Sequence, residues 1–294
     1  MAEGRLIRWV FAGGKPQGIR VLQHAIECGW PPDLIVWPPE LPAADLAALR
    51  GLADSAEIPT ASSSTLEERI EELARFDLLL TCRFGLLKPA VFEAPRLGAI
   101  NVHSSLLPLY RGVHPVAWAL VRGEQITGVT VHRIDANVDT GPILASIEVP
   151  VASDDDIWTL TAKLDAASAV AVAEVMEEAH RTGRLPPGRP QTGVSSRAPR
   201  RRPEDGRVDW SRSARGVYDL CRALRPPLPP PFAFLGRDRT VRFLDFRPPV
   251  ASRQDAPAGT VVATIDGGWY AIACVDGVIE LRTDIELAPG TLLS

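Results

Sequence analysis

The chain has 294 residues, of which 46% are hydrophobic and 23% are charged, and its formal net charge is −4. These values are close to the averages for globular proteins, so they exclude a disordered or fibrous chain. The length predicts one large domain and one small one. No window approaches the roughly 20 apolar residues of a membrane span and no signal-like segment opens the chain, so we expect a cytoplasmic protein with no membrane partner.

Cysteine and arginine content give two further expectations. The cysteines lie far apart and form no C-x-x-C pair, so we expect reduced thiols and no metal site. They are Cys28, Cys82, Cys221 and Cys274. Charge is uneven, with 13 arginines and 6 acids between Arg197 and Arg247. We interpret this segment as a solvated face, with contact to an anionic substrate as the alternative.

Helix-like and strand-like segments alternate over the first 180 residues. Expected strands are 5–12, 33–37, 76–81, 98–102, 128–134 and 142–151, from their apolar and β-branched runs. Expected helices are 17–27, 43–54, 65–74, 88–94, 113–122 and 154–180. Such alternation predicts an α/β fold with a mostly parallel sheet and helices on both faces.

A second, smaller domain follows. Residues 183–203 are rich in Gly, Pro, Ser and Arg and show no apolar period, which predicts a linker. Beyond it we expect a helix at 211–224 and strands at 240–246, 259–265, 269–275 and 278–282. Asp-Gly pairs at 266–267 and 276–277 predict hairpin turns. The chain is therefore divided into residues 1–190, a linker at 191–204 and a small β-barrel-like domain at 205–294.

The segment 101–112, NVHSSLLPLYRG, begins at the carboxyl end of a predicted strand, the edge where open α/β sheets bind ligands. Alternation along an extended chain points Asn101 and His103 the same way. The amide can donate to a developing oxyanion and the imidazole can take a proton from an amine, which suits acyl transfer. From the residues alone, a hydrogen-bonded core histidine is an equally good interpretation of His103.

A carboxylate on a neighbouring loop usually orients such an imidazole. Asp135 and Asp139 both lie in loop 135–141, which we expect to leave the sheet at the same edge. Their spacing does not decide between them, and ordinary turn formation is the competing interpretation of the loop. We interpret His24, His132 and His180 as structural residues. His114 is interpreted as a helix-entry residue.

The string N-x-H-x-S-L-L-P-x-Y-R-G at 101–112, followed by V-D-T-G-P-I at 138–143, resembles the folate-dependent formyltransferases. The resemblance covers nearly the whole chain. It implies a Rossmann-like formyl-transfer domain followed by a small OB-like β-barrel, as in methionyl-tRNA and sugar formyltransferases. It also implies that Asn101, His103 and Asp139 are catalytic, which decides between the two aspartates.

The same resemblance implies 10-formyltetrahydrofolate as formyl donor, with its pterin between segment 83–89 and loop 135–141. Flat aromatic ligands fit apolar walls with a few polar groups, and both segments offer these. Expected donor-binding residues are Arg83, Phe84, Gly85, Leu86, Leu87, Asp135 and Val138. Expected acceptor-binding residues are Ser104, Ser105, Tyr110 and Arg111.

The amine acceptor divides this family. Members that act on tRNA resemble one another in a long basic loop after the second strand, whereas here segment 37–42 is short and no Lys or Arg lies between Arg20 and Arg50. Because tRNA binding needs phosphate contacts, we expect a small-molecule amine, such as a nucleotide-linked amino sugar or a specialised metabolite. Methionyl-tRNA is the alternative, supported by the arginine-rich segment 197–247. The glycinamide-type members lack the second domain.

Two other classes compete with this interpretation. A nicotinamide-linked dehydrogenase would need G-x-G-x-x-G and a later acidic residue, and GGKPQG at 13–18 does not match. A non-catalytic folate-binding protein would keep the fold, but the complete Asn, His and Asp set favours an enzyme. The sequence leaves the oligomeric state open, with a homodimer as one possibility.

Overall fold

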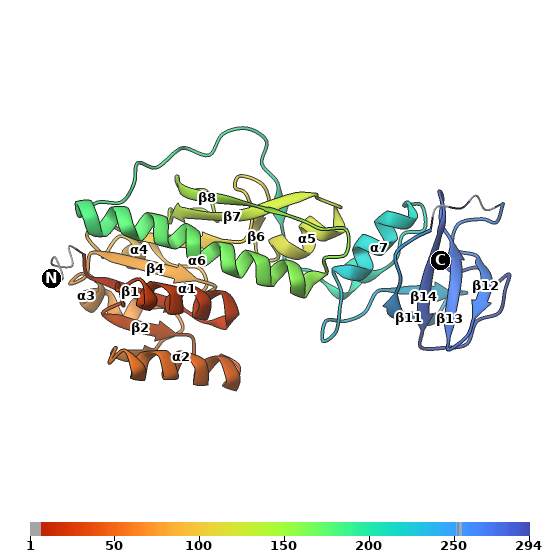
Figure 1. Ribbon diagram of the computed structural model, residues 1–294, viewed down its shortest axis with the longest axis horizontal. Helices are drawn as coiled ribbons and strands as arrows, with labels where there is room; N and C mark the ends of the chain where they lie inside the picture. The colour runs from red at the N-terminus through yellow and green to blue at the C-terminus, as the bar shows by residue number, and fades with distance from the viewer. Residues whose placement is uncertain (1–6, 251, 253–254) are drawn as a thin grey trace. The chain divides into compact units, whose positions relative to one another are not determined.

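The computed structural model describes residues 7–250, 252 and 255–294. Their contacts divide the chain into two compact units, drawn in Figure 1. The first unit comprises 1–115, 126–150 and 161–198, and the second comprises 116–125, 151–160 and 199–294. Helices α5 (Pro115–Val121) and α6 (Ile157–Thr182) contain residues of both units. The domain boundaries expected from the sequence remain a prediction.

A seven-stranded sheet forms the centre of the first unit, in the order β3-β2-β1-β4-β5-β7-β8. Its strands are β1 (Trp9–Gly13), β2 (Leu34–Trp37), β3 (Thr60–Ser62), β4 (Leu78–Cys82), β5 (Ala99–His103), β7 (Ile126–Arg133) and β8 (Ile143–Pro150). Neighbours from β3 to β5 are parallel, and β7 and β8 are antiparallel to their neighbours. This confirms the mostly parallel α/β sheet. Strands β1 and β4 are buried along their whole length, because continuous apolar runs suit strands covered on both faces.

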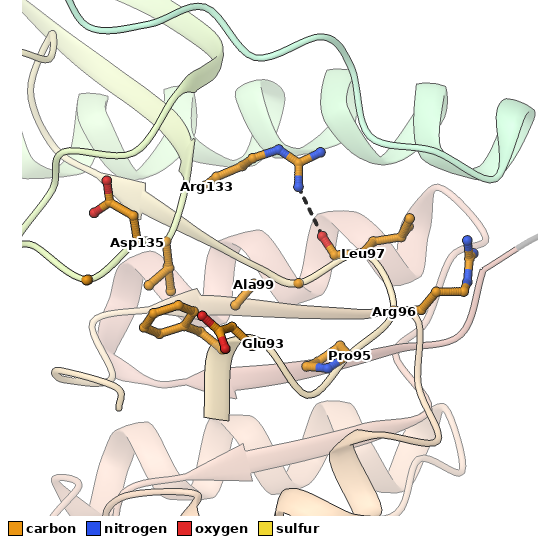
Figure 2. A pocket seen from close by; sticks show the side chains of 11 residues that line it. Glu93, Pro95, Arg96, Leu97, Ala99, Arg133 and Asp135 are labelled. Atoms are coloured by element: carbon orange, nitrogen blue, oxygen red, sulfur yellow. Dashed lines mark hydrogen bonds between the residues drawn. The ribbon is translucent and has the colours of Figure 1, made fainter. Parts of the chain in front are cut away.

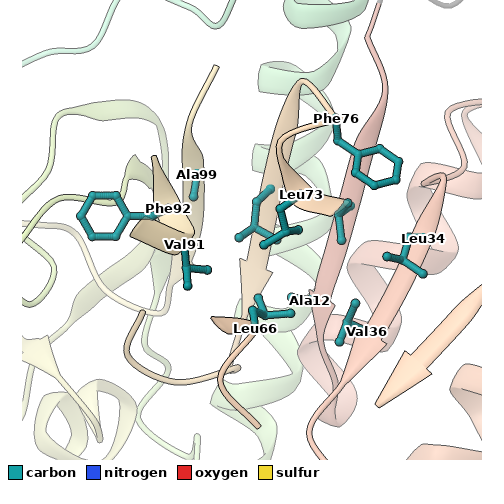
Figure 3. Packing of buried hydrophobic residues seen from close by; sticks show 11 residues of the cluster. Ala12, Leu34, Val36, Leu66, Leu73, Phe76, Val91, Phe92 and Ala99 are labelled. Atoms are coloured by element: carbon teal, nitrogen blue, oxygen red, sulfur yellow. The ribbon is translucent and has the colours of Figure 1, made fainter. Parts of the chain in front are cut away.

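Helices cover both faces of this sheet. The helices before β7 are α1 (Lys15–Glu27), α2 (Ala43–Ser55), η1 (Glu67–Arg69), α3 (Ile70–Leu73) and α4 (Pro89–Phe92). On one face, α1 lies beside α6, and Gln17 of α1 donates to Ser168 of α6. On the other face, Leu73 of α3 and Phe92 of α4 belong to one apolar cluster with β-strand residues such as Ala12 (Figure 3).

Two expectations about the first unit were wrong in detail. Strand β7 is antiparallel to β5, so loop 135–141 starts at the opposite sheet edge from His103 and folds back toward it. The helix expected at 65–74 begins only at 67, because Leu66 has a left-handed backbone with φ 64°. Within residues 191–204, whose assignment as a linker remains a prediction, β9 (Arg197–Ala198) pairs in parallel with β6 (Arg111–Gly112).

The second unit contains a five-stranded antiparallel sheet in the order β10-β11-β14-β13-β12. Its elements are η2 (Pro203–Gly206), α7 (Ala214–Arg222), β10 (Phe232–Leu235), β11 (Arg239–Phe246), β12 (Val261–Ile265), β13 (Trp269–Ala273) and β14 (Val278–Thr283). The expected Asp-Gly turns join β12 to β13 and β13 to β14. Leu293 bridges to Leu235 of the edge strand β10, and Leu292 bridges to Thr260 beside the other edge strand. Through these two bridges, residues 292–293 connect the two edges of the five-stranded sheet, as expected of a barrel-like module.

Strand β10 was missed because a Pro-rich run precedes it. In the second unit, Ser213 caps α7 by accepting a hydrogen bond from the Gly216 N–H, as serine commonly does. Among the described residues, no helix is both long and apolar enough to cross a membrane.

Candidate active site

The three residues expected to be catalytic come together beside the end of β5. His103 is the last residue of this strand, and its Nδ1 lies 3.5 Å from Oδ2 of Asp139. Asn101 lies two residues earlier, and its Nδ2 lies 3.3 Å from Nε2 of His132. The same Nε2 lies 3.5 Å from Oδ1 of Asp139. His132 therefore links Asn101 to Asp139.

His132, which the sequence indicates only as a structural residue, belongs to the site. The residue lies on β7 directly opposite Asn101 in the antiparallel register. It is buried, and its ring meets that of His103 edge to face with centroids 6.5 Å apart. Only the direction and register of β7 bring it to the site, and the sequence had not given either.

Asn101 is held in one orientation by its neighbours. The Thr81 hydroxyl donates to Oδ1 of Asn101 at 2.9 Å, so the amide oxygen faces β4. The amide nitrogen then faces His132. Since an amide nitrogen carries two hydrogens, one N–H remains for an oxygen atom of a substrate.

The proton positions on both histidines follow from their backbone partners. Nε2 of His103 lies 2.9 Å from the Tyr110 carbonyl, and Nδ1 of His132 lies 2.8 Å from the Arg133 carbonyl. A carbonyl only accepts, so each of these nitrogens carries the hydrogen. When either ring is neutral, it therefore turns its unprotonated nitrogen toward Asp139.

Burial sets the charge of this cluster. Burial lowers the pKa of His103, although the Asp139 carboxylate and the Tyr110 carbonyl oppose the shift. Burial also opposes ionisation of Asp139, but a hydrogen bond from the protonated His132 ring, the charges of both histidines when protonated and the Gly112 amide together hold its pKa below the ordinary value. At neutral pH the site thus holds a carboxylate facing a neutral imidazole that can accept a proton.

The two aspartates of the loop have different surroundings. Asp135 forms a local turn, accepting from the Asn137 N–H at 3.1 Å and the Thr140 hydroxyl at 2.6 Å. Asp139 instead accepts from the Gly112 N–H at 2.8 Å and faces the two histidines. Its left-handed backbone, with φ 54°, is tolerated better by Asp than by most residues. The geometry thus favours Asp139 for contact with His103.

The segment after α6 returns to the site and supports both of its loops. We call residues 189–198 the return segment. Its Gln191 donates to the Asp139 carbonyl at 2.9 Å and the Gly141 carbonyl at 2.8 Å. Its Ser196 hydroxyl accepts from the Tyr110 N–H at 2.9 Å. The return segment, which overlaps the expected linker at 191–204, therefore supports the site.

The residues expected to bind the acceptor are largely occupied within the protein. The Ser104 hydroxyl accepts from Gln17, and the Ser105 hydroxyl donates to the Leu109 carbonyl. Both serines and Tyr110 are buried. Arg111 donates to Gln191 through Nε at 3.1 Å and through Nη2 at 2.6 Å. Their contact with the acceptor stays a prediction.

A cavity of about 490 Å³ lies next to loop 135–141 (Figure 2). Phe92, Ala99 and Ile134 provide apolar walls, and Asp135 lies on its lining. Figure 2 also shows Arg133, whose guanidinium donates to the Leu97 carbonyl at 3.0 Å. The lining also includes the charged residues Glu93, Arg96 and Arg133, so the cavity offers both apolar walls and polar groups to a flat aromatic ligand.

Some of the residues expected to bind the donor lie near the cavity, whereas Arg83 lies toward α1. Phe84 and Leu87 pack against the apolar cluster that includes the cavity residues Phe92 and Ala99. Leu86 and Val138 are exposed, and Gly85 has the positive φ of 138°. Arg83, in contrast, turns toward α1, where its Nε donates to Oε1 of Gln17 at 2.9 Å.

A buried carboxyl lies on this α1 side. Asp165 of α6 is only 7% exposed, and its Oδ1 has no hydrogen-bond partner in the described part of the chain. Burial raises its pKa to about 6, and the charge of Arg83 opposes the shift. Asp165 is not distinguished by the sequence, because it lies within an Ala-rich helix.

Comparisons with known proteins show the family to which the chain is similar. The sequence matches the family model described as "Formyl transferase" over residues 50–176 and that described as "Formyl transferase, C-terminal domain" over 201–291. It is 41% identical over 164 residues to a methionyl-tRNA formyltransferase of Thermodesulfovibrio yellowstonii, covering 55% of this chain and 52% of that protein. It is 35% identical over 227 residues to the enzyme of the same name from Pelobacter propionicus, covering 77% and 68%. The first match thus spans about half of the relative's length.

Solved structures show the same fold. An N-formyltransferase from Helicobacter canadensis, crystallised with folinic acid and dTDP-3-aminofucose, superposes with a TM-score of 0.70. The superposition covers 94% of this chain and 98% of that one, at 17% sequence identity. At this identity the likeness concerns the fold alone.

Proposed function

Because the chain belongs to the formyl transferase family, we propose that it transfers a formyl group from 10-formyltetrahydrofolate to a primary amine. The observation that carries the proposal is the arrangement of Asn101, His103 and Asp139 at the end of β5. An amide donor, a neutral imidazole and an ionised carboxylate are the groups that acyl transfer to an amine requires.

We assign each group a step. The free N–H of Asn101 donates to the negative charge that develops on the formyl oxygen as the amine attacks. His103 takes the proton that the amine releases and returns it to the nitrogen that the formyl carbon leaves. When its Nε2 exchanges the Tyr110 carbonyl for the substrate, the ring hydrogen moves to Nδ1, which faces Asp139, and Nε2 can accept a proton. Asp139 then stabilises the resulting imidazolium at the nitrogen it already faces.

The cavity beside loop 135–141 is our candidate for the donor site. Its apolar walls, Phe92, Ala99 and Ile134, fit a pterin ring, and the loop that supplies Asp135 also supplies Asp139. The donor would supply the activated formyl group at this position. The chain's own contribution would be to hold the donor beside Asn101.

For the acceptor, we propose a small-molecule amine, with a nucleotide-linked amino sugar as the leading candidate. Only residues 38–42 join β2 to α2, and this connection contains no Lys or Arg. A polyanion such as tRNA needs several cationic contacts. The structure therefore lacks, among its described residues, a basic loop at this place.

Methionyl-tRNA is the second candidate, and a specific observation supports it. The relatives reported above, at 35% to 41% identity, are methionyl-tRNA formyltransferases. The 13 arginines of segment 197–247 could contact phosphates. A non-catalytic folate-binding protein is a third outcome, in which the donor binds but no product forms.

A competition among acceptors tests these alternatives. Enzyme and formyl donor are incubated with amino-sugar nucleotides and with methionyl-tRNA, and mass spectrometry detects the added formyl group. Acceptor affinity is then measured at about 50 and 200 mM salt, where tRNA binding should weaken by orders of magnitude and small-molecule binding only modestly. Formylation of methionyl-tRNA with a steep salt dependence, and of no small amine, would overturn our choice of acceptor.

A further inference from the structure

The return segment contains a side chain that couples the two loops of the site. Gln191 donates both of its amide hydrogens to the 135–141 loop, at the Asp139 and Gly141 carbonyls. Its Oε1 accepts two hydrogen bonds from Arg111, which lies in the loop that follows His103. Every hydrogen-bonding group of this amide is therefore used, and it joins the His103 loop to the Asp139 loop.

We propose that Gln191 and Arg111 act as a positioning pair that fixes the Asp139 carboxylate opposite His103. This inference rests on the proposed function, and it assigns a role to residues outside the expected catalytic set. Neither side chain needs to touch substrate. Their effect passes through the backbone of Asp139, whose carbonyl is bound by Gln191 while its side chain faces His103.

The backbone of loop 135–141 explains why such support is needed. Asp139 has a left-handed φ of 54°, a conformation that costs energy for a residue other than Gly. Gly141 lies so close to Arg133 that an added Cβ would come within 1.9 Å of the Arg133 carbonyl oxygen. The side chain of Asp139 is bonded to the chain at one backbone group, the Gly112 N–H. The two bonds from Gln191 hold the loop from its other side.

Substitutions at Gln191 test the donor and acceptor groups of its amide separately. Gln191→Glu keeps an acceptor for Arg111 but loses both donors to the loop, and Gln191→Leu loses all four bonds. Both should lower kcat about 10- to 100-fold, because small displacements of a catalytic group have effects of this size. The KM for the donor should change less than threefold. Gln125→Glu, the same change at an exposed residue, is the matched control and should retain the wild-type rate.

Three readouts distinguish positioning from a general loss of structure. The thermal transitions of the variants should stay close to that of the wild type. For Gln191→Leu, which adds no charge, the acid limb of the kcat profile should move to lower pH, because His103 would lose the nearby carboxylate while keeping its other charged neighbours, His132 and Arg83. In a double-mutant cycle, Arg111→Lys should add little to Gln191→Leu, since the two side chains act as one unit.

The outcomes separate this inference from the proposed function. If Asp139→Asn abolishes turnover while both Gln191 variants keep kcat within twofold of wild type, the positioning role is refuted and the function stands. It is equally refuted if activity falls only in proportion to the unfolded fraction. If Asp139→Asn itself leaves turnover unchanged, the function assigned to the site fails first.

Discussion

Replacing Asp139 by Asn removes a charge with almost no change of shape. The variant amide can still accept from the Gly112 N–H, so the loop should keep its structure. What is lost is the charge-assisted bond to an imidazolium at His103, now 3.5 Å away. Hydrogen bonds to charged groups contribute about 1.5 to 3 kcal/mol, and about 1.4 kcal/mol corresponds to a tenfold change in rate, so turnover should fall about 10- to 160-fold.

The assay is single-turnover formylation at saturating donor and acceptor, measured across pH. Because the Asp139 carboxylate opposes the lowering of the His103 pKa by burial, the variant should have a still lower His103 pKa. The acid limb of its rate profile should therefore move to lower pH. Asp135→Asn is the matched comparison in the same loop. It should affect the KM for the donor more than the rate, because Asp135 lines the cavity and forms a local turn.

Either of two results would refute this reasoning. One is an Asp139→Asn rate within twofold of wild type. The other is a larger loss of rate from Asp135→Asn than from Asp139→Asn, which would show that the wrong carboxylate had been assigned to His103.

Three further predictions concern other residues. His132→Asn should slow turnover about fivefold, because it removes one neutral hydrogen bond to Asn101. His132→Gln, whose side chain can still reach Asn101, should slow turnover less. Equal reductions in rate for the two variants would contradict this. The Asp165 pKa is raised to about 6, so the unfolding free energy of the wild type should fall as pH rises from about 4 to about 6. Above pH 6, and not near pH 4, Asp165→Asn should be more stable than the wild type by about 1 to 2 kcal/mol. Denaturant titrations of both proteins near pH 4 and above pH 6 would test this. Arg222→Met should lower the unfolding free energy of the second unit by about 2 to 4 kcal/mol, because Arg222 is buried and binds the carbonyls of Ala152 and Asp155. The exposed Arg237→Met is its control in denaturant titrations, and equal stability of the two variants would argue against the role of Arg222.

The sequence was most informative where structure is local. Continuous apolar runs predicted β1 and β4, because strands covered on both faces need no polar alternation. The Asp-Gly pairs predicted two hairpins, because their turn needs backbone conformations that these residues adopt readily. The motif at 101–112 located Asn101 and His103 for the same reason, since both lie on one strand.

The features that the sequence did not reveal depend on distant contacts. The direction of β7 decides where loop 135–141 starts and places His132 opposite Asn101, yet an isolated strand does not encode its direction in a sheet. Gln191 acts through hydrogen bonds from a single side chain within a stretch rich in Gly and Pro, so it leaves no periodic signal. The unpartnered Oδ1 of Asp165 became visible only once α6 was placed beside α1.

The return segment has a consequence for how the site could be inactivated by a protease. Gln191 and Ser196, which hold the two site loops, are separated by exposed chain in which Val194 is 83% exposed and Gly193 has a φ of 89°. Exposed loop tips of this kind are preferred cleavage points. A single cut at Val194 would remove no catalytic residue and leave the sheet intact. It would, however, break the covalent connection between Gln191 and Ser196, so that activity is lost from a protein that still appears folded.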